Sequence, residues 1–442
     1  FVPTSTFKGE LLMKRMTGLA AITGAAFLLS ACGSDSGGEV AQDDAADDTA
    51  VVAEDEAVST EAPERDESAD LVIWTDNVRA PVVQEYADQF GEEFGITAKV
   101  QVTTDTRQQF KDATNVGQGP DIIIGAHDWL GELVQDGTVE PIQMSSETES
   151  AFTPESIEAT KFNGQIYGVP YSTENLALIR NVDMAADLPA TMEELISTGT
   201  ELVDSGDAEA PMVTPVGQPG DAYHAFPYLA AYGGGIFATL PEGGFDPNDV
   251  ILDSPETVQG AEKIAELGEA GALNASVDST TAESLFTEGQ SPFFVTGPWS
   301  IPAIQEAGIN YEISPIPEFE DGGVPVPFLG VQMFYVSADA ANPTLAQEFV
   351  NNYVPTPDFQ MAMFEAGGRP PALQETLDAV SGDSDDIAAL AEAGEGAQPM
   401  PNIPAMNAVW GPLGVAEVDI IGGADPAERM GTAQTEITSN IE

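Results

Sequence analysis

Residues 71–126 alternate short apolar runs with helical stretches, and this alternation restricts the fold more than any other feature of the chain. Apolar residues of 79–94 recur at helical spacing, and a second helix is predicted over 106–116. The apolar runs that flank these helices are "LVIW" at 71–74, "ITAKVQV" at 96–102 and "DIII" at 121–124. Strand, helix, strand, helix and strand at this spacing predict right-handed βαβ units and a parallel sheet, and therefore an α/β fold.

The pattern continues less regularly through the rest of the chain. Strands are predicted for "QIYGVPYS" and "NLALIR" within 165–180, for "PFFVT" at 292–296 and for "VQMFYVS" at 331–337. Thr191 followed by Glu194 predicts a capping box at the start of a helix. Further helices are expected near 343–366 and over most of the chain after about residue 385.

The charge of the chain excludes several classes of partner. The 442 residues contain 74 acidic and 13 basic side chains, a formal net charge of -61. Such a surface repels nucleic-acid phosphates and anionic membrane surfaces. We interpret the acidity as a means of staying soluble, for example in a salty medium, rather than as a site for a cationic partner.

Cysteine and histidine are too scarce for several kinds of chemistry. Cys32 is the single cysteine, so the chain forms no internal disulfide and no thiolate metal cluster. His127 and His224 are the two histidines, which argues against a zinc site or a Cys–His nucleophile, and we expect no metal and no cofactor. We expect His127 to be a hydrogen-bonded structural residue rather than a catalyst.

The N-terminal part reads as an export signal followed by a tether. In "MKRMTGLAAITGAAFLLSAC", residues 13–32, a basic start precedes a short apolar stretch, and the ending resembles a bacterial lipobox. That resemblance implies cleavage before Cys32 and lipid attachment to it, while the alternative is an ordinary signal in which Cys32 is incidental. Met13 is the expected start, with 1–12 an upstream extension. Residues 32–70 are acidic and poor in aromatic residues, and predict a disordered tether.

Polar and aromatic residues gather where predicted strands end. In open α/β sheets, ligands bind outside the carboxyl ends of the strands. Three such ends, at 125–129, 171–175 and 296–299, carry carboxylates or aromatic rings, and "MPNIPAMNAVW" at 400–410 adds another tryptophan. Together they predict a ligand site.

Several segments resemble, in order, the maltose/maltodextrin-binding proteins, the extracytoplasmic solute receptors of carbohydrate ABC importers. The segments that carry the resemblance are "LVIW", "GPDIIIGAHDWLG", "NGQIYGVPYSTENLALIRN", "FTEGQSPFFVTGPWSI", "PFLGVQMFYVS" and "MPNIPAMNAVW". The resemblance implies a two-lobed fold of the type II periplasmic binding proteins, with hinge strands and a central cleft that closes on the ligand. The expected N-terminal lobe comprises 71–173 and 335–380, and the expected C-terminal lobe comprises 174–334 and 381–442.

The same resemblance implies the function and the partners. The chain is expected to capture maltose or maltodextrin-type oligosaccharides as a non-catalytic monomer and to deliver them to the permease subunits of an ABC importer. It is expected to be exported and held by lipidated Cys32 at the outer face of the cytoplasmic membrane, in the periplasm or at the cell surface. Aromatic rings cover the C–H face of a pyranose, and carboxylates accept hydrogen bonds from its hydroxyls.

The resemblance also implies roles for individual residues, each with a structural alternative. Asp128 and Glu174 match hydroxyl-binding carboxylates; the alternatives are a helix N-cap and a solvated strand-edge charge. Tyr223 matches a stacking ring, with Asp221 beside it. Trp299 and Trp410 match the main stacking tryptophans. The alternative for these three rings is core packing, which we also expect for Trp74.

Two regions depart from the family pattern. Gly125 stands where well-known members have an aromatic residue, and Trp129 stands where they have an arginine. Compared with the family pattern, this exchange implies that an aromatic ring has moved across the cleft and that a charged hydroxyl donor has been lost. Asp76 and Arg79 are candidates to replace the family's aspartate and lysine in a shorter first loop, with a solvated loop as the alternative.

Two other classes of function stay open. A surface glycosidase needs a pair of carboxylates about 5–9 Å apart, for which Asp128 and Glu174 are candidates. A receptor of the same fold for trehalose, cyclodextrin, another oligosaccharide, a polyamine or a metal chelate is the other alternative, although the scarcity of histidine disfavours the chelate.

Overall fold

The structure is a computed structural model that describes residues 62–241 and 243–441. The predicted export signal, the expected start at Met13, the lipid attachment at Cys32 and most of the predicted tether lie outside the described residues. The last part of that predicted tether is described, and it packs on the folded body. Arg65 forms an ion pair with Asp121, Nη2 to Oδ2 2.7 Å, and donates to the backbone oxygen of Gly119. The folded body therefore begins before residue 71.

The larger sheet has the strand order β13-β12-β3-β1-β2, and β6 pairs with β12 outside this order. Its strands are β1 (Leu71–Thr75), β2 (Ala98–Val102), β3 (Ile122–Ala126), β6 (Gly168–Glu174), β12 (Phe328–Val336) and β13 (Gln398–Pro399). The predicted parallel pairing is confirmed for β1 with β2 and with β3. Strand β12 runs antiparallel to both β3 and β6, so the sheet is mixed.

A second sheet, in the order β10-β7-β11, is antiparallel throughout. Its strands are β7 (Ala177–Asn181), β10 (Phe293–Thr296) and β11 (Tyr311–Ser314). Two small hairpins complete the strands: β4 (Lys161–Phe162) with β5 (Gln165–Ile166), and β8 (Phe237–Thr239) with β9 (Phe245–Val250). The sequence predicted the strands of this sheet at 175–180 and 292–296 but did not predict their antiparallel pairing.

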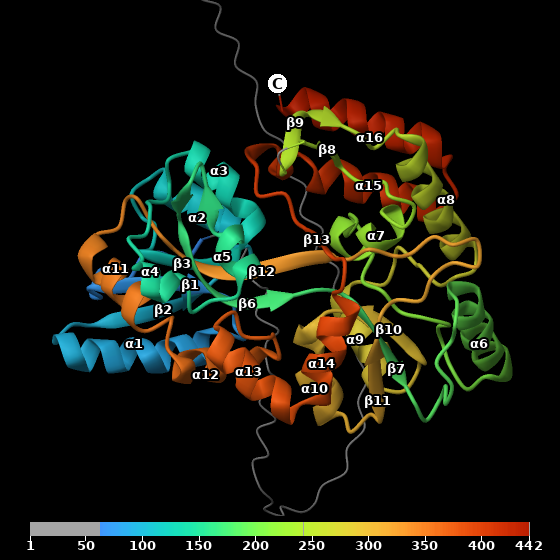
Figure 1. Cartoon of the computed structure of the whole chain (residues 1–442), viewed down its shortest axis with the longest axis horizontal. Helices are drawn as coiled ribbons and strands as arrows, with labels where there is room; N and C mark the ends of the chain where they lie inside the picture. The colour runs from blue at the N-terminus through green and yellow to red at the C-terminus, as the bar shows by residue number, and fades with distance from the viewer. Residues whose placement is uncertain (1–61, 242, 442) are drawn as a thin grey trace, which may run out of the picture. The chain divides into compact units, whose positions relative to one another are not determined.

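Helices cover both sheets, and the predicted α/β class is confirmed (Figure 1). Those of the first half are α1 (Ala80–Phe94), α2 (Thr106–Thr114), η1 (His127–Trp129), α3 (Leu130–Gln135), α4 (Ser146–Glu149), α5 (Pro154–Ala159), α6 (Met192–Ser205) and α7 (Ala222–Leu229). Those of the second half are α8 (Pro255–Glu269), α9 (Ser279–Thr287), η2 (Pro298–Ser300), α10 (Ile301–Glu306), α11 (Pro343–Asn352), α12 (Pro357–Gly367), α13 (Gln374–Asp383), α14 (Asp385–Ala393), η3 (Pro404–Ala408), α15 (Trp410–Ile421) and α16 (Pro426–Ile441).

The capping box at Thr191 forms with one change of partner. Thr191 Oγ1 accepts a hydrogen bond from the backbone N–H of Glu194 at 3.2 Å, as predicted. The carboxylate of Glu194 reaches back to the N–H of Ala190 rather than to that of Thr191. Two side-chain hydrogen bonds, one accepted by Thr191 and one by Glu194, therefore stabilise the first turn of α6.

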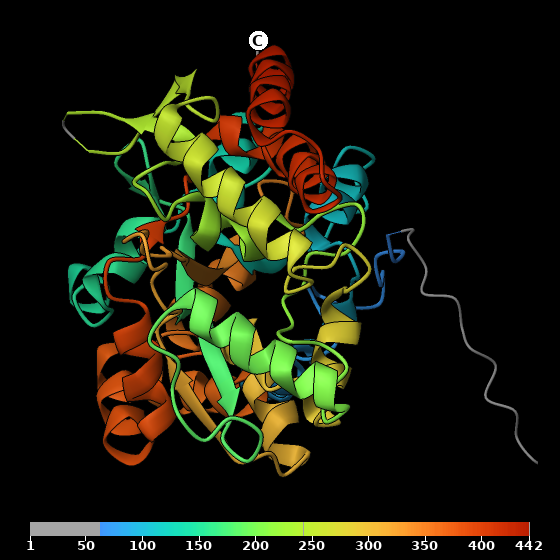
Figure 2. The same ribbon diagram turned by 90° about the vertical axis from the view of Figure 1, so that its right-hand side faces the viewer.

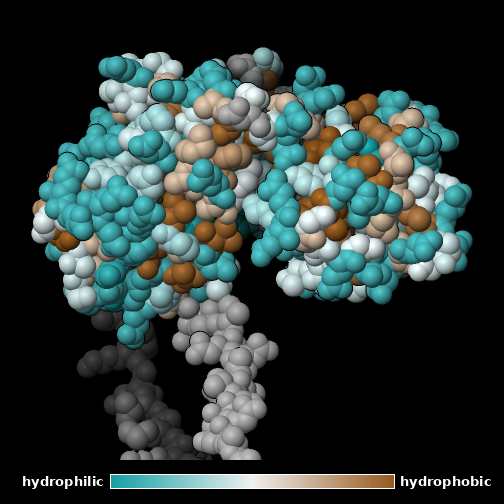
Figure 3. All heavy atoms as spheres, turned by 90° about the horizontal axis from the view of Figure 1, so that it is seen from below, coloured by the Kyte–Doolittle hydropathy of each residue, from teal (hydrophilic) through white to brown (hydrophobic). Residues whose placement is uncertain are grey.

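Buried side chains form separate cores in two lobes. One lobe packs around β1, β3 and β12, with Ile73 and Phe334 among its fully buried residues. The other packs around β7, β10 and helices α7, α8, α15 and α16, and contains Phe293 and Leu413. Figure 2 shows α15 and α16 beside α8 in this second lobe. The face seen in Figure 3 is hollowed between the lobes.

The chain passes between the lobe cores at 174–176, along β12 and at 373–380. Strand β12 is the longest of these connections. It begins at Phe328, in the core of one lobe, and ends at Val336, in the core of the other. The lobe boundaries given above stay predictions. Among the described residues, no helix is both long and apolar enough to cross a membrane.

Candidate ligand-binding site

Two cavities lie on opposite faces of β12. Its side chains alternate, as they do along any strand: Gln332 and Phe328 contact residues of one cavity, whereas Leu329 and Val331 line the other. The first, the front cavity, measures about 420 Å³ and is lined by Arg107, Ala126, Asp128, Trp129, Glu174, Tyr223, Trp299, Arg369, Met400 and Trp410. The second, the rear cavity, measures about 730 Å³.

Three of the four tryptophans of the chain line the front cavity: Trp129, Trp299 and Trp410. All three are half-buried, so part of each ring stays available to a ligand. Trp129 comes from the first lobe, at the end of β3, whereas Trp299 follows β10 and Trp410 begins α15 in the second lobe. Trp74, in contrast, is fully buried and donates to Gln101, as expected for a core residue.

Two of these rings lie directly on glycines at the ends of strands. A Cβ atom added to Gly125 would lie 1.8 Å from Cζ3 of Trp129, and one added to Gly297 would lie 2.1 Å from Cζ3 of Trp299. Both glycines therefore permit a close approach that no other residue allows. The ring of Trp129 fills the space that a side chain at position 125 would take. The aromatic residue that the family pattern has at position 125 is therefore replaced here by the ring at position 129.

Asp128 is buried, with 6% of its surface exposed, yet its carboxylate lines the front cavity. Its Oδ2 accepts a hydrogen bond from Nε1 of Trp410 at 3.1 Å, which links the two lobes. Burial raises the pKa of Asp128 to about 6, although Arg107 and Trp410 act in the opposite direction. The structural alternative does not apply, since Asp128 lies inside η1 and Trp129 occupies the N-cap of α3.

Glu174 ends β6 at the point where the chain enters the second lobe. One carboxylate oxygen accepts from Nε2 of Gln332 at 2.8 Å, and the other pairs with Nε of Arg369 at 2.5 Å. Burial alone would raise the pKa of Glu174, but Arg369 and these hydrogen bonds outweigh it and hold the pKa below its usual range. Glu174 is therefore ionised and held rigidly, with 6% of its surface exposed.

Tyr223 and Asp221 come from the start of α7 and take different roles. The ring of Tyr223 lines the front cavity and lies 6.1 Å from that of Trp299 and 6.0 Å from that of Phe328, centroid to centroid. Asp221 is the N-cap of α7, since its carboxylate accepts from the backbone N–H of His224 at 3.1 Å and contacts the His224 ring. The carboxylate of Asp221 is thereby used within the protein.

Asp76 and Arg79 lie one layer behind the cavity. They form an ion pair, Oδ2 to Nη1 2.9 Å, and Arg79 also donates to Oε1 of Gln332 at 3.0 Å. Gln332 in turn holds Glu174, so Arg79 supports the front cavity without lining it. Of the nine residues predicted to bind ligand, the structure brings six to the front cavity and leaves Asp76, Arg79 and Asp221 outside its lining: the six are Asp128, Trp129, Glu174, Tyr223, Trp299 and Trp410.

Four lining residues were not predicted: Arg107, Ala126, Arg369 and Met400. The guanidinium of Arg369 lies over the ring of Trp299, 5.3 Å from its centroid, while it pairs with Glu174. The signal that could have found the two arginines is their rarity, because the whole chain has only 13 basic residues. No sequence pattern distinguishes Ala126 or Met400.

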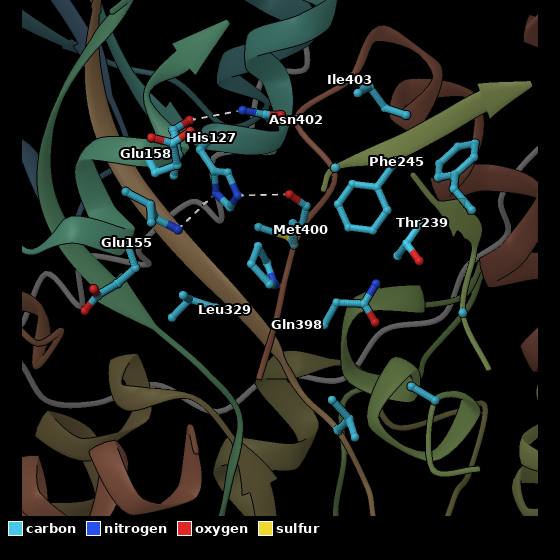
Figure 4. Close-up of a pocket in the computed structure, with 18 of the residues that line it drawn as sticks. His127, Glu155, Glu158, Thr239, Phe245, Leu329, Gln398, Met400, Asn402 and Ile403 are labelled. Carbon is cyan, nitrogen blue, oxygen red and sulfur yellow. Dashed lines mark hydrogen bonds between the residues drawn. The ribbon is translucent and has the colours of Figure 1, made fainter. Parts of the chain in front are cut away.

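His127 holds the site from the rear side. It is fully buried; its Nδ1 accepts from the backbone N–H of Val331 at 3.1 Å, and its Nε2 lies 3.1 Å from the backbone oxygen of Met400 (Figure 4). These two bonds require Nε2 to carry the proton, and burial lowers the pKa of His127 to about 4. The prediction of a structural histidine is confirmed, and His127 fixes the turn that presents Asp128 and Trp129.

The rear cavity differs in chemistry. In Figure 4, Glu155 and Glu158 lie on one side of it, and Phe245 and Thr239 lie on the other. Lys161 pairs with Glu158, Nζ to Oε2 3.4 Å, so charge there is partly neutralised within one lobe. The remaining walls are mostly apolar side chains and glycines.

The front cavity suits a ligand with an apolar face and a rim of hydroxyl groups. Half-buried aromatic rings cover such a face, and two carboxylates and two guanidinium groups accept from or donate to the hydroxyls. Within residues 62–241 and 243–441, no three His, Cys, Asp or Glu side chains come together as metal ligands would.

Comparisons with known proteins agree with this chemistry. The chain is 28% identical over 386 residues to a galactooligosaccharide-binding protein of Bacillus subtilis, covering 85% of this chain and 90% of that one. It is 29% identical over 388 residues to a maltotriose-binding protein of Pyrococcus abyssi, covering 85% and 83%. It is 25% identical over 425 residues to a maltooligosaccharide ABC transporter solute-binding lipoprotein of Streptococcus pneumoniae, covering 94% of each.

A family model described as a bacterial extracellular solute-binding protein matches residues 85–393. The match spans both lobes and includes eight of the ten residues that line the front cavity, all but Met400 and Trp410. This chain belongs to the bacterial extracellular solute-binding protein family.

Proposed function

We propose that the chain is the solute receptor of an ABC importer and that it binds maltodextrin-type oligosaccharides in the front cavity. One observation carries the proposal: three tryptophans and Tyr223 surround the buried carboxylates of Asp128 and Glu174 in one cavity. Rings of both lobes would cover the sugar faces, and the carboxylates would accept from its hydroxyls. The names of the relatives, which include maltotriose-, maltooligosaccharide- and galactooligosaccharide-binding proteins, support this ligand class.

Calorimetric titration tests the proposal directly. Maltose, maltotriose and a cyclodextrin are the ligands expected to release heat and to change tryptophan fluorescence, since three of the four tryptophans line the cavity. Galactotriose, trehalose and spermidine separate the alternatives within the same fold. An absence of heat and of any fluorescence change with every sugar would contradict the proposal, and binding of spermidine alone would replace it with a polyamine receptor.

Ligand capture would involve bending at the connections between the lobes. The crossing at 174–176 and strand β12 join the two cores, and Asp128 already contacts Trp410 across the cleft. A sugar held by Trp129 from one lobe and Trp299 from the other would favour lobe closure, because it contacts both walls only in the closed form. Small-angle X-ray scattering should show a smaller radius of gyration with maltotriose than without it.

Export and anchoring form the second part of the proposal. Cys32 would carry the lipid, and residues 33–61 would hold the binding lobes away from the membrane. The name of the pneumococcal relative includes the word lipoprotein, which supports the anchor. Mass spectrometry of the mature N-terminus tests it: the expected mass includes a diacylglyceryl group on Cys32, and Cys32→Ala should release the protein into the medium.

The glycosidase alternative rests on the different pKa shifts of Asp128 and Glu174. A raised pKa beside a lowered one is the arrangement that an acid and its partner carboxylate need. However, both oxygens of Glu174 are engaged, one by Gln332 and one by Arg369, which leaves neither free to attack a sugar. Incubation with maltotetraose should yield no shorter product; release of maltose would establish the enzyme.

A further inference from the structure

Arg107 is the cation of the front cavity for which the described part of the chain provides no ion-pair partner. It is half-buried and lines the cavity beside Asp128 and Trp129. Within residues 62–241 and 243–441 its guanidinium makes no hydrogen bond and no ion pair. Every other arginine of that part of the chain forms an ion pair: Arg65, Arg79, Arg180, Arg369 and Arg429.

Neither local structure nor overall charge explains this position. Arg107 lies in the first turn of α2, where the positive end of the helix dipole disfavours a cation. Acidic residues outnumber basic ones 74 to 13, and each of the other described arginines has found a carboxylate partner. A half-buried guanidinium that lines the cavity without an ion pair among the described residues is free to donate to a ligand.

The segment at the end of β3 provides an acceptor and an aromatic ring for a ligand but no basic donor. This segment presents a carboxylate, Asp128, and a ring, Trp129, which lies on Gly125. The residue directly after Asp128 is Trp129, so no basic residue stands beside the carboxylate in the sequence. Arg107 comes from a neighbouring element of the same lobe, and its charge acts on Asp128 although the two form no ion pair within 4.0 Å.

We propose that Arg107 is a ligand-contacting residue that determines specificity, and that it recognises a pyranose ring with two free neighbouring hydroxyls. This inference rests on the proposed sugar-binding function. The carboxylate of Asp128 accepts from one hydroxyl, and N–H groups of Arg107 donate to the oxygen of the next. A hydroxyl is both donor and acceptor, so a carboxylate and a guanidinium on either side of a gap satisfy such a pair together. A ring that lacks or substitutes either hydroxyl leaves a buried group unpaired and is rejected.

Titration with maltotriose provides the first test. Arg107→Gln should lower the affinity at least tenfold, and Arg107→Lys should lower it less, because a lysine keeps the charge but loses the planar pair of donors. The matched control is Lys99→Gln, which removes the same charge from an exposed residue of β2 that also has no ion pair among the described residues. Lys99→Gln should bind as the wild type does. An affinity of Arg107→Gln within twofold of the wild type overturns the inference.

Deoxy analogues of maltotriose provide the second test, because they separate a direct contact from an indirect one. In the wild type, removing the contacted hydroxyl should weaken binding at least tenfold; in Arg107→Gln the same removal should have almost no further effect. Equal penalties in both proteins for every analogue would mean that Arg107 does not touch the sugar. If the wild type binds no sugar at all, the proposed function fails; if it binds and Arg107→Gln binds equally well, this inference alone fails.

Discussion

The front and rear cavities share a wall but differ in almost every property that matters for binding. The rear cavity is the larger, about 730 Å³ against about 420 Å³. Yet the smaller one holds three tryptophans, two buried carboxylates and two guanidinium groups, whereas the larger has apolar walls, glycines and charges at its edge. Cavity volume alone would favour the rear cavity, whereas the chemistry of the lining favours the front cavity as the proposed site.

The wall between them shows how one short segment serves both sides. His127 and Asp128 are neighbours in η1, but His127 faces the rear cavity and Asp128 faces the front one. Burial shifts their pKa values in opposite directions, to about 4 for His127 and to about 6 for Asp128, so both neutral forms are favoured. His127 satisfies its nitrogens within the protein, whereas Asp128 keeps one oxygen for a ligand.

The largest difference between the cavities should appear when an ion pair is broken. Arg369→Met leaves Glu174 buried without its cation, and the free energy of unfolding should fall by about 3 kcal/mol. Lys161→Met breaks the pairs with Glu149 and Glu158 beside the rear cavity, where the side chains are more exposed, and should cost no more than about 1 kcal/mol. Urea unfolding without ligand measures both values.

Arg369→Lys is the control for this comparison, since it restores the charge without the planar donor group. It should recover part of the stability that Arg369→Met loses. Equal losses for Arg369→Met and Lys161→Met would mean that the buried ion pair of the front cavity contributes no more to the free energy of unfolding than the exposed pairing at the rear cavity.

The next largest effect should be on affinity, when an aromatic ring is removed. Trp410→Ala deletes a stacking ring and the hydrogen bond to Asp128, and should weaken maltotriose binding by about 2 kcal/mol or more, roughly 30-fold. Phe245→Ala removes a ring from the rear cavity and should leave affinity within about twofold. Calorimetry at one temperature compares the two. A similar loss for Phe245→Ala would place ligand in the rear cavity instead.

Much of this site follows from local sequence, and the rest depends on packing. A strand end is a local property, so "IIIGAHDW" and "VTGPW" indicated Asp128, Trp129 and Trp299 as candidates, and all three line the front cavity; their binding of ligand stays a prediction. Arg107 and Arg369 reach the cavity from α2 and from the loop after α12, and only the tertiary arrangement brings them there. Asp221 has the same local appearance as Asp128, but a helix start at residue 222 turns its carboxylate into a cap.

The fold shows the same division. Alternating strands and helices predicted the parallel part of the larger sheet, because βαβ units are formed by neighbouring segments. The antiparallel partners β6 and β12 are separated from β3 by long stretches of chain, and no local pattern specifies their register. That register decides which side chains of β12 point toward the front cavity and which toward the rear cavity.

A smaller effect should follow from pH, with opposite signs for affinity and stability. Because a hydroxyl donates to the ionised carboxylate, affinity should rise about tenfold between pH 5 and pH 7 as Asp128 loses its proton near pH 6. The raised pKa stabilises the protonated folded state, so this contribution is complete below 3.8 and is lost as pH rises through about 6. Calorimetry across this range should show a flat profile for Asp128→Asn; a slope that survives in this variant would assign the titration to another group.

The smallest expected effect comes from adding a single methyl group on each side of the wall. Gly125→Ala places a Cβ 1.8 Å from the Trp129 ring, so the ring must leave its position over the strand end, and maltotriose affinity should fall about threefold to tenfold. Gly235→Ala is the matched variant in the rear cavity, where the nearest atom lies at an ordinary 3.9 Å, and it should change nothing. The fluorescence of Trp129 should shift in the first variant even without sugar. If Gly125→Ala keeps both affinity and fluorescence, the ring is not held by the glycine, and the aromatic exchange between positions 125 and 129 has no bearing on the ligand.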